Sequence, residues 1–376
     1  MFLVPRSGFF VAQRDAENPK TGNHEPRTKE MKLSLITALL LAPLTVLHAA
    51  ELVEVRKIWD EAPHNAFTDL LRFQDRWFCV FREGSAHNSP DGAVRVITST
   101  DGVKWESASL MRMTPETFSG LKPRNPLRDS YLDLRDPHLC LTPDGRLMLN
   151  SCLTYNKGRN WQSLFWLSDD GRNWGAPVLI AEPQDWLWRV TWHKGKAYGV
   201  GRVPTERIPR LYKSEDGRRF EVLVKDADFF PLVPGPSEAT IRFLPDDTAL
   251  CLLRMNRMTG SKTDHAHLGT ASPPYTRWTW KDLGKPIGGP DLITLPDHRL
   301  IAAVRLYDRK IRTALCWLDP QAGTMEEFLA LPSGGNVSNS HDTSYAGLVY
   351  REGLLWVSYY SAHEGKAAIY LARVKL

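Results

Sequence analysis

One short turn occurs three times along the chain, at 99–105, 168–174 and 214–220. Each copy reads S-x-D-G-x-x-aromatic and follows an apolar run typical of a β-strand. The aspartate can accept backbone N–H bonds within its own turn, the glycine permits a positive φ, and the aromatic ring can pack between strands. A turn that recurs in this way indicates a repeated supersecondary unit, which restricts the fold to architectures built from copies of that unit.

A second periodic feature is a series of short polar turns, each lying between two apolar runs. Six such turns occur, with centres 69, 50, 52, 51 and 55 residues apart, and each predicts a β-hairpin. They lie at 74–76, 143–145, 193–195, 245–247, 296–298 and 351–353. Degenerate forms of the S-x-D-G turn follow the fourth and fifth hairpins, at 272–278 and 319–323.

Together the two features predict an all-β fold, a six-bladed β-propeller with four antiparallel strands in each blade. Each unit holds a hairpin of strands A and B, and the S-x-D-G turn joins strands C and D. The last unit ends one strand short, and the unattached strand at 52–59 can complete it, which leaves no long open edge. Two stacked β-sandwiches are the alternative, but they predict no constant period.

The first fifty residues differ from the rest. A short basic start at Met31 is followed by an apolar run at 33–47 and then by small residues, which predicts a secretory signal peptide at 31–50. Because a signal peptide should begin at its own start codon, we interpret 1–30 as a non-native or disordered extension. The propeller domain then spans 51–376, and we expect the protein to be secreted or periplasmic.

The charge balance restricts the partners. A formal net charge of +5 at pH 7 is mild, and the chain has no dense run of Lys and Arg, so composition gives no reason to expect nucleic-acid binding. Beyond the predicted signal peptide we expect no membrane-spanning segment. The five cysteines match no zinc-binding spacing and no metal-ligand cluster stands out, so we expect no metal and no cofactor. The oligomeric state stays open.

The propeller topology predicts which polar residues meet. The starts of the A strands and the ends of the B strands share one face of the ring, close to its axis and opposite the S-x-D-G turns. Arginines occupy the same B-strand position in four blades, and four converging arginines favour a ligand with a carboxylate, sulfate or phosphate. Alternatively, these arginines pair with acidic residues around the channel. The arginines are Arg82, Arg202, Arg254 and Arg305, the acidic residues are Asp133, Asp136, Glu238 and Asp291, and His64, His87 and Asp91 reach the same face.

In these motifs the chain resembles the sialidase (neuraminidase) superfamily, whose propellers carry S-x-D-G-x-x-W turns known as Asp boxes. The segment 81–84 (FREG), followed by Asp91 and the first turn, is similar to the family stretch that carries a loop aspartate. Glu238, with Arg254 after it, resembles the family's glutamate and second arginine, and Arg305 resembles the third arginine.

The resemblance implies a secreted retaining exo-glycosidase, an exo-α-sialidase-like glycoside hydrolase that releases a terminal acidic sugar from glycans. The segment 344–348 resembles the one bearing the family's nucleophile, which implies that Tyr345 is the nucleophile, Glu238 its base and Asp91 the acid/base. A carboxylate on the anomeric carbon of sialic acid repels an anionic nucleophile but not a tyrosine. The substrate-binding candidates are Arg82, Arg254, Arg305, Asp136 and Arg202.

One segment departs from the family pattern. The family's first arginine opens the first blade, but the corresponding segment here, 65–69, reads NAFTD and contains no arginine. Arg82, on the neighbouring B strand, could reach the same space. Without such a residue the arginine triad is incomplete, and the sugar need not be sialic acid.

Two other interpretations stay open. The segment 134–138 (LRDPH) resembles a strand start in five-bladed glycosidases, in which Asp136 and Glu238 would act as a carboxylate pair on another sugar. The third interpretation is a non-catalytic propeller that binds a glycan or a protein. Substitution of Tyr345 and Asp91 separates these interpretations, because only the sialidase mechanism needs both residues.

Overall fold

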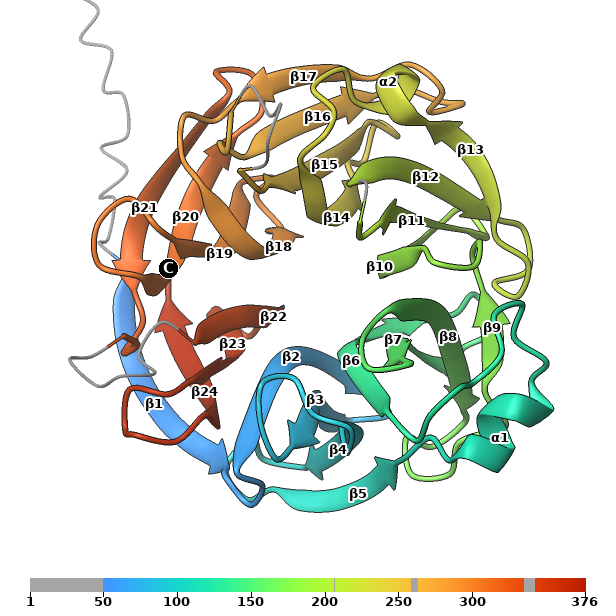
Figure 1. Cartoon of the computed structure of the whole chain (residues 1–376). Helices are drawn as coiled ribbons and strands as arrows, with labels where there is room; N and C mark the ends of the chain where they lie inside the picture. Colours follow the sequence, from blue (N-terminus) through green and yellow to red (C-terminus); the bar gives the residue numbers. More distant parts are fainter. Residues whose placement is uncertain (1–49, 206, 258–262, 335–341) are drawn as a thin grey trace, which may run out of the picture. The chain divides into compact units, whose positions relative to one another are not determined.

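The computed structural model describes residues 50–205, 207–257, 263–334 and 342–376. These residues form six four-stranded antiparallel sheets arranged as blades around an axis (Figure 1), which confirms the predicted six-bladed β-propeller. The predictions for 1–30 and for a signal peptide at 31–50 concern residues outside this description, apart from Ala50. Among the described residues, no helix combines the length and apolarity needed to cross a bilayer.

Five blades take four consecutive strands each, from the axis outward (Figure 1). Two short helices, α1 (Pro115–Gly120) and α2 (Asp226–Phe229), lie in the connections from blade 1 to blade 2 and from blade 3 to blade 4. The strands are β2 (His64–Phe73), β3 (Arg76–Gly84), β4 (Ala93–Ser99) and β5 (Glu106–Met111) in blade 1; β6 (Leu132–Leu141), β7 (Leu147–Tyr155), β8 (Asn160–Ser168) and β9 (Val178–Ile180) in blade 2; β10 (Trp186–His193), β11 (Lys196–Val203), β12 (Ile208–Ser214) and β13 (Glu221–Lys225) in blade 3; β14 (Pro236–Phe243), β15 (Ala249–Met255), β16 (His267–Ala271) and β17 (Thr279–Asp282) in blade 4; and β18 (Ile287–Thr294), β19 (Leu300–Leu306), β20 (Arg312–Asp319) and β21 (Thr324–Ala330) in blade 5.

Blade 6 closes the ring with strands from both ends of the propeller. It contains β22 (Thr343–Arg351), β23 (Leu354–Ser361) and β24 (Ala368–Lys375), with β1 (Glu51–Trp59) as its outer strand. β1 pairs antiparallel with β24 along its length (Figure 1). This pairing confirms the predicted closure and satisfies an edge that would otherwise be open.

The apolar core lies between neighbouring blades. All nine residues of β7 are buried, because a strand in the middle of a blade is covered on both faces. Between blades 1 and 2, Phe78 and Val94 pack in one cluster with Leu149 and Leu164. This packing fixes the inner strands of adjacent blades relative to one another, and the candidate site is built on those strands.

The S-x-D-G turns join the third and fourth strands of blades 1, 2 and 3. Asp101 Oδ1 accepts the backbone N–H groups of Val103 and Lys104 at 2.8 and 2.9 Å, and Asp170 and Asp216 make the same pair of bonds in their turns. These bonds satisfy N–H groups that the strands leave free. The recurrence of the turn therefore reflects one local hydrogen-bond solution used in three blades.

Every inner strand carries a β-bulge at the same level. Phe67, Asp136 and Tyr345 lie in bulges and have positive φ values of 62°, 47° and 50°. A bulge re-aims a side chain out of the regular alternation of a strand. The register between first and second strands shifts at 66–69, 135–138, 187–190, 236–239, 288–291 and 344–347.

Candidate active site

The centre of the candidate site is a direct contact between Tyr345 and Glu238. The Tyr345 hydroxyl, on β22, donates to Glu238 Oε1, on β14, at 2.6 Å. Arg254, near the end of β15, donates to the same carboxylate oxygen at 2.6 Å and to the Tyr345 hydroxyl at 3.2 Å. The backbone N–H of Gly289 donates to Glu238 Oε2 at 2.6 Å. The fold thus joins three residues that the sequence analysis selected, two from blade 4 and one from blade 6.

The surroundings fix the charges in this contact. Burial alone would raise the pKa of the Glu238 carboxyl, but the charge of Arg254 and the hydrogen bonds from Arg254, Tyr345 and Gly289 outweigh it and lower that pKa to about 2. Burial, and then the neighbouring Glu238 charge, raise the pKa of Tyr345 well above its ordinary value. At neutral pH the glutamate is therefore ionised and the phenol keeps its proton.

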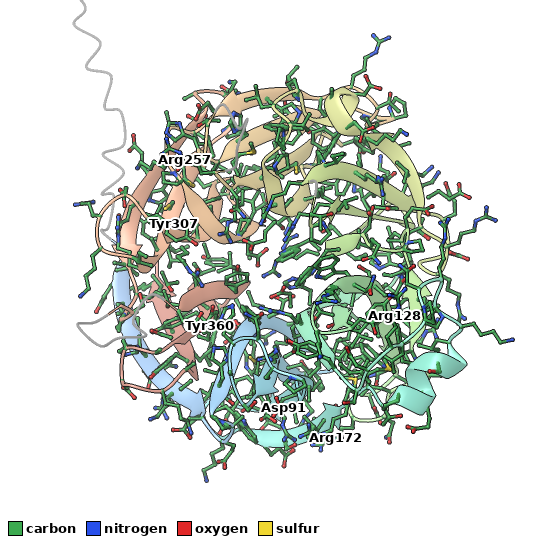
Figure 2. The ribbon with its side chains drawn as sticks, viewed as in Figure 1. Asp91, Arg128, Arg172, Arg257, Tyr307 and Tyr360 are labelled. Carbon is green, nitrogen blue, oxygen red and sulfur yellow. The ribbon has the colours of Figure 1, made fainter. Side chains whose placement is uncertain are left out.

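Arg305 lies over the ring of Tyr345, with 5.2 Å between its guanidinium carbon and the ring centroid. Its guanidinium contacts the hydroxyls of Tyr360, at 2.8 Å, and Tyr307, at 3.4 Å, both labelled in Figure 2. Its ion pair with Asp342 is long, at 3.8 Å. Its Nε also donates to Thr343 O at 2.7 Å, so the charge of Arg305 faces one distant carboxylate and lies over the ring of Tyr345.

Arg202, on β11, is buried but keeps free donors. Its guanidinium carbon lies 5.6 and 5.9 Å from the ring centroids of Trp186 and Trp188. Among the described residues, Nε and Nη1 of Arg202 have no hydrogen-bond partner. Burial, and then the charge of Arg207, lower the pKa of Arg202 to about 10. Because a buried cation with unsatisfied donors is unfavourable, the side chain is suited to an anionic or hydroxyl-bearing ligand.

Asp136 is a carboxyl group buried in the bulge of blade 2. It is 4% exposed, and its Oδ1 has no hydrogen-bond partner in the described part of the chain. Burial raises the pKa of Asp136 to about 6, with Arg135 opposing and Glu238 reinforcing the shift. The group can therefore take up or release a proton near neutral pH, which is a property of catalytic acids and bases.

Arg82 does not join this group. Its side chain is 0% exposed, and its Nε donates to Asp133 Oδ1 at 2.7 Å. The two terminal nitrogens donate to Ala86 O, at 2.9 Å, and Ser89 Oγ, at 2.8 Å. The sequence analysis had left open that the arginines pair with acidic residues around the channel, and Arg82 does so with Asp133. Arg82 therefore holds the loop between β3 and β4 against blade 2, and each of its three guanidinium nitrogens is already bonded within the protein.

Asp91 is exposed and turned toward its own loop. Its carboxylate accepts Ser85 N at 3.1 Å and Ser85 Oγ at 3.0 Å. Partial burial would raise the pKa of Asp91, but hydrogen bonds from Ser89 and Ser85 lower it. Figure 2 shows Asp91 over blade 1, away from the centre of the ring. In this structure the predicted acid/base is an ionised carboxylate engaged within the loop.

A cluster near Tyr345 joins residues to which the sequence assigned no catalytic role. His64 Nε2 and His87 Nδ1 lie 2.6 and 3.1 Å from Asp342 Oδ2. The Tyr360 hydroxyl donates to Asp342 Oδ1 at 2.6 Å. Asp342 is 278 positions from His64 and 255 from His87, so no local spacing pattern reveals the cluster.

The same cluster has the geometry of a metal site but not its electrostatics. One ligand atom each from His64, His87 and Asp342 lies within 4.8 Å of the others, which is close enough for one ion. However, Arg135 lies 3.4 Å from His87 Nε2, and Arg305 lies 3.8 Å from Asp342. Two guanidinium groups at this distance oppose a further cation, so we describe the cluster as a hydrogen-bonded one.

A separate ion-pair network ties the inner strands together. Arg189 pairs with Asp69 at 3.0 Å and with Asp291 at 3.6 Å. Arg242 pairs with Asp291 at 2.7 Å. All four residues come from inner strands of different blades or their bulges, so this network links the blades, and Asp291 is not a partner of the candidate site arginines.

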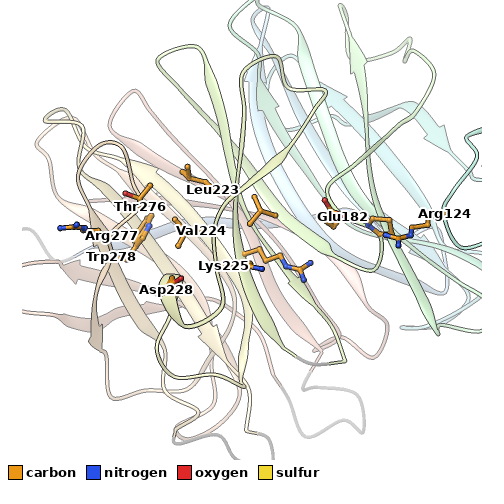
Figure 3. A pocket seen from close by; sticks show the side chains of 12 residues that line it. Arg124, Glu182, Leu223, Val224, Lys225, Asp228, Thr276, Arg277 and Trp278 are labelled. Carbon is orange, nitrogen blue, oxygen red and sulfur yellow. The ribbon is translucent and has the colours of Figure 1, made fainter.

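Two of the cavities among the described residues bear on the position of the site. One of about 580 Å³ is lined by His64, His87 and Asp342. Another, of about 990 Å³, lies among outer segments of blades 3 and 4 and includes Val224 and Trp278 (Figure 3). Neither cavity is lined by Tyr345, Glu238 or Asp91, but the first is lined by the cluster of His64, His87 and Asp342.

Comparison with known proteins supports the fold. No protein-family model matches the chain, and no curated protein matches it in sequence. A Dyadobacter fermentans protein of unknown function is similar with a TM-score of 0.70 and 17% identity, over 87% of this chain and 99% of that one. An α-L-arabinofuranosidase from Fusarium graminearum is similar with a TM-score of 0.64 and 14% identity, over 86% of this chain and 98% of that one. The Trypanosoma rangeli sialidase in complex with sialic acid is similar with a TM-score of 0.61 and 12% identity, over 86% of this chain and 58% of that one. At these identities the likeness shows a shared six-bladed propeller architecture.

Proposed function

We propose that this chain is a secreted or periplasmic retaining exo-glycosidase of sialidase type, which releases a terminal sugar bearing a carboxylate. The observation that carries the proposal is the Tyr345 hydroxyl donating to Glu238 at 2.6 Å, with Arg254 contacting both. A tyrosine paired with a carboxylate suits an anomeric centre that already bears negative charge. The fold shared with a sialidase and an α-L-arabinofuranosidase supports a glycan substrate by analogy.

The mechanism depends on Arg254. While it pairs with Glu238, the lowered pKa of about 2 makes that carboxylate a weak base. A substrate carboxylate that draws Arg254 toward itself removes a main stabilisation of the ionised glutamate and so strengthens it as a base. Binding of an anionic sugar and activation of Tyr345 are thereby coupled, and a neutral sugar gains no such activation.

Three arginines can supply the carboxylate clamp. Arg254 and Arg305 both contact Tyr345, and two buried donors of Arg202 have no partner among the described residues. We assign the third position of the clamp to Arg202 and not to Arg82, because each guanidinium nitrogen of Arg82 is already bonded within the protein. The proposed clamp therefore still contains three arginines, although none of them comes from the first blade.

A second candidate function rests on Asp136. Its pKa of about 6 and its unpartnered Oδ1 fit a general acid, with Glu238 as the second carboxylate of a pair acting on a neutral sugar. Structural similarity to an α-L-arabinofuranosidase and to an α-L-arabinanase is consistent with this choice. In that case Tyr345 serves only to orient Glu238.

The test is hydrolysis of a 4-methylumbelliferyl α-sialoside compared with 4-methylumbelliferyl α-L-arabinofuranoside and other neutral glycosides. We expect turnover of the sialoside, a loss of about 10³-fold or more in Tyr345→Phe, and unchanged turnover in Tyr350→Phe, a tyrosine of the same strand. Preference for a neutral sugar, with Asp136→Asn inactive and Tyr345→Phe active, favours the carboxylate pair. Glycan binding without turnover of any substrate in the panel would instead support a non-catalytic propeller that binds glycans.

Export is a separate part of the proposal. The predicted signal peptide at 31–50 implies a mature protein that begins near Glu51. N-terminal sequencing of the exported protein is expected to begin near this residue. Recovery of residues 1–30 in the mature product would contradict the interpretation of both segments.

A further inference from the structure

A cavity of about 990 Å³ lies away from the axis of the ring, along the outer edge of blade 3. Its lining includes residues 222–225 of β13, the outermost strand of that blade. Figure 3 shows Arg124 near one end of the cavity and Arg277 and Trp278 at the other, with Lys225 between them. The volume is at the upper end of the range of about 300–1,000 Å³ that is usual for ligand pockets. We call this cavity the outer groove, and it is large enough for an oligosaccharide.

Three exposed cations border the outer groove without an ionic partner. Arg124, Lys225 and Arg277 come from the connection between blades 1 and 2, from β13 and from the turn before β17. Their side chains make no hydrogen bond or ion pair with another residue that the structure describes. A fourth cation, Arg210, is anchored, since its Nη1 donates to the two carboxylate oxygens of the buried Asp185 at 2.7 and 2.8 Å. The groove therefore presents one fixed guanidinium and three charges that a ligand can neutralise.

Two carboxylates line the outer groove together with these cations. They belong to Glu182 and Asp228, and both side chains are exposed. Carboxylates accept hydrogen bonds from hydroxyl groups, while guanidinium and ammonium groups donate to oxygen acceptors. A lining with both kinds of group suits a ligand with many hydroxyls. Because the three unpaired cations outnumber the two carboxylates, the lining favours a ligand that also carries negative charge.

The ring of Trp278 gives the outer groove a flat apolar surface. Its Nε1 donates to Tyr275 O at 2.9 Å, and the ring stacks on that of Trp280 with centroids 5.7 Å apart and 25° between the planes. Phe229 packs edge-on against it, with centroids 5.4 Å apart. These contacts hold the ring in place before a ligand binds. Stacking the apolar face of a sugar ring on it therefore costs little side-chain entropy.

The edge of β13 is poorly suited to the addition of a peptide strand. The pairing of β12 with β13 matches Leu211 with Val224 and Tyr212 with Val222, so that a bulge in β13 skips Leu223. The next residue after Val224 is Lys225. A bulge and a lysine on an outermost strand both discourage the pairing of a further strand. A sugar chain needs no backbone ladder, so the lining fits a glycan better than an extended peptide.

We propose that the outer groove binds an acidic oligosaccharide, whose sugar rings bear carboxylates or sulfates. One sugar ring stacks on Trp278, the three unpaired cations bind the acidic groups, and the two carboxylates accept hydroxyls. None of the candidate catalytic residues lines the groove, so this inference does not depend on the proposed function. A site at this position holds an acidic glycan on the outer wall of the propeller and leaves the axis open.

The first test is isothermal titration calorimetry of the full-length protein with three tetrasaccharides. These are an oligomer of galacturonic acid, a heparin-derived fragment and neutral maltotetraose, which separate carboxylates from sulfates and both from uncharged sugars. We expect at least one acidic tetrasaccharide to bind about tenfold or more tightly than maltotetraose. In the triple variant Arg124→Gln, Lys225→Gln and Arg277→Gln, we expect this affinity to fall about tenfold or more, because charge-assisted hydrogen bonds are lost.

A control variant separates the groove from the overall charge of the protein. Lys104→Gln, Arg351→Gln and Lys375→Gln together remove three exposed cations that lie outside the groove, and we expect unchanged affinity in this variant. Raising NaCl from about 0.05 M to about 0.5 M should weaken acidic binding in the wild type more than in the groove variant, since salt screens exposed charges. Turnover of small 4-methylumbelliferyl glycosides should be the same in both triple variants and the wild type.

The stacking role of Trp278 is tested separately. Trp278→Leu keeps an apolar side chain but removes the flat ring, so we expect weaker binding of acidic and neutral tetrasaccharides alike. Thermal unfolding monitors whether this variant is folded, because Trp278 also packs on Trp280 and Phe229. If it does not fold, the triple variant of exposed residues still tests the proposal.

Three outcomes would overturn the proposal. Equal affinity of the wild type and the groove variant for the acidic tetrasaccharides would place their binding elsewhere. Equal affinity of the wild type for acidic and neutral tetrasaccharides would rule out the acidic class. Tighter binding of a hexaglutamate peptide than of either acidic tetrasaccharide would make the partner a peptide. Because calorimetry does not require turnover, failure of the chemistry at Tyr345 would leave a positive result at the groove standing.

Discussion

Replacing Glu238 with glutamine is expected to cost stability in a pH-dependent way. The pKa of this carboxyl falls from an ordinary 4.5 to about 2 in the folded protein, which corresponds to about 3 kcal/mol of stability at pH 6. Because the folded pKa is the lower one, the contribution is complete above the unfolded pKa and is lost as the pH falls toward the folded pKa. At pH 3 only about 1 kcal/mol remains.

The structure explains why glutamine cannot replace the carboxylate. Glu238 accepts from Tyr345 and Arg254 on one oxygen and from Gly289 on the other. An amide has one acceptor and one donor group, so one of these donors would face an NH₂ group. The charge of Arg254 would also lose its partner, and removing one partner of a buried ion pair costs about 3–5 kcal/mol.

Urea unfolding at pH 6 and pH 3 measures the effect. The difference between wild type and Glu238→Gln should be large at pH 6 and should shrink by about 2 kcal/mol at pH 3. Glu326→Gln, an exposed glutamate of β21, is the matched control and should change stability by less than about 0.5 kcal/mol. Equal stability of Glu238→Gln and wild type at pH 6, or a difference that does not shrink in acid, would refute the assigned charge state.

Three further predictions test the geometry. A Cβ at Gly289 would lie 2.7 Å from the Tyr345 ring, and the φ of Gly289 is 54°. Gly289→Ala should therefore reduce kcat about tenfold or more. The control is Gly145→Ala, where φ is 79° and the space around the glycine is open, and it should change thermal stability only. Arg202→Met should raise the melting temperature while raising KM, because it removes a buried cation with unused donors; a lower melting temperature would contradict this. Arg82→Met leaves a buried carboxylate unpaired and should destabilise the fold by about 3–5 kcal/mol in urea titrations, and wild-type stability in this variant would contradict the pairing.

The fold was predictable because its determinants are local. The S-x-D-G turn works through hydrogen bonds within a few residues, as Asp101 shows with Val103 and Lys104. Hairpin turns at near-constant spacing then give the number of blades, and the missing strand of the last blade matches the spare strand β1. The pairing of Tyr345 with Glu238 came only from the resemblance to sialidases, and the two side chains are in contact at 2.6 Å.

Contacts between residues that no such pattern relates could not be predicted from the sequence. Asp342 lies 255 positions from His87, and no spacing rule relates them. The orientation of Asp91 depends on Ser85, whose N–H and hydroxyl bind the carboxylate within the loop. A loop carboxylate that reads as a catalytic group in sequence can be satisfied locally, and only the folded loop shows this.

Sequence alone determined the propeller, its closure and the face to which the arginines belong, because strand periodicity and turn chemistry are short-range properties. It did not determine which arginine meets a ligand. Arg82 and Arg202 occupy equivalent ends of second strands, facing Ala66 and Trp186 across the hairpin. Asp133 of the next blade, 51 positions away, neutralises Arg82. Arg202 instead contacts tryptophan rings, and two of its donors have no partner in the described part of the chain. The difference lies in the neighbouring chain segment, which only the tertiary structure brings into contact.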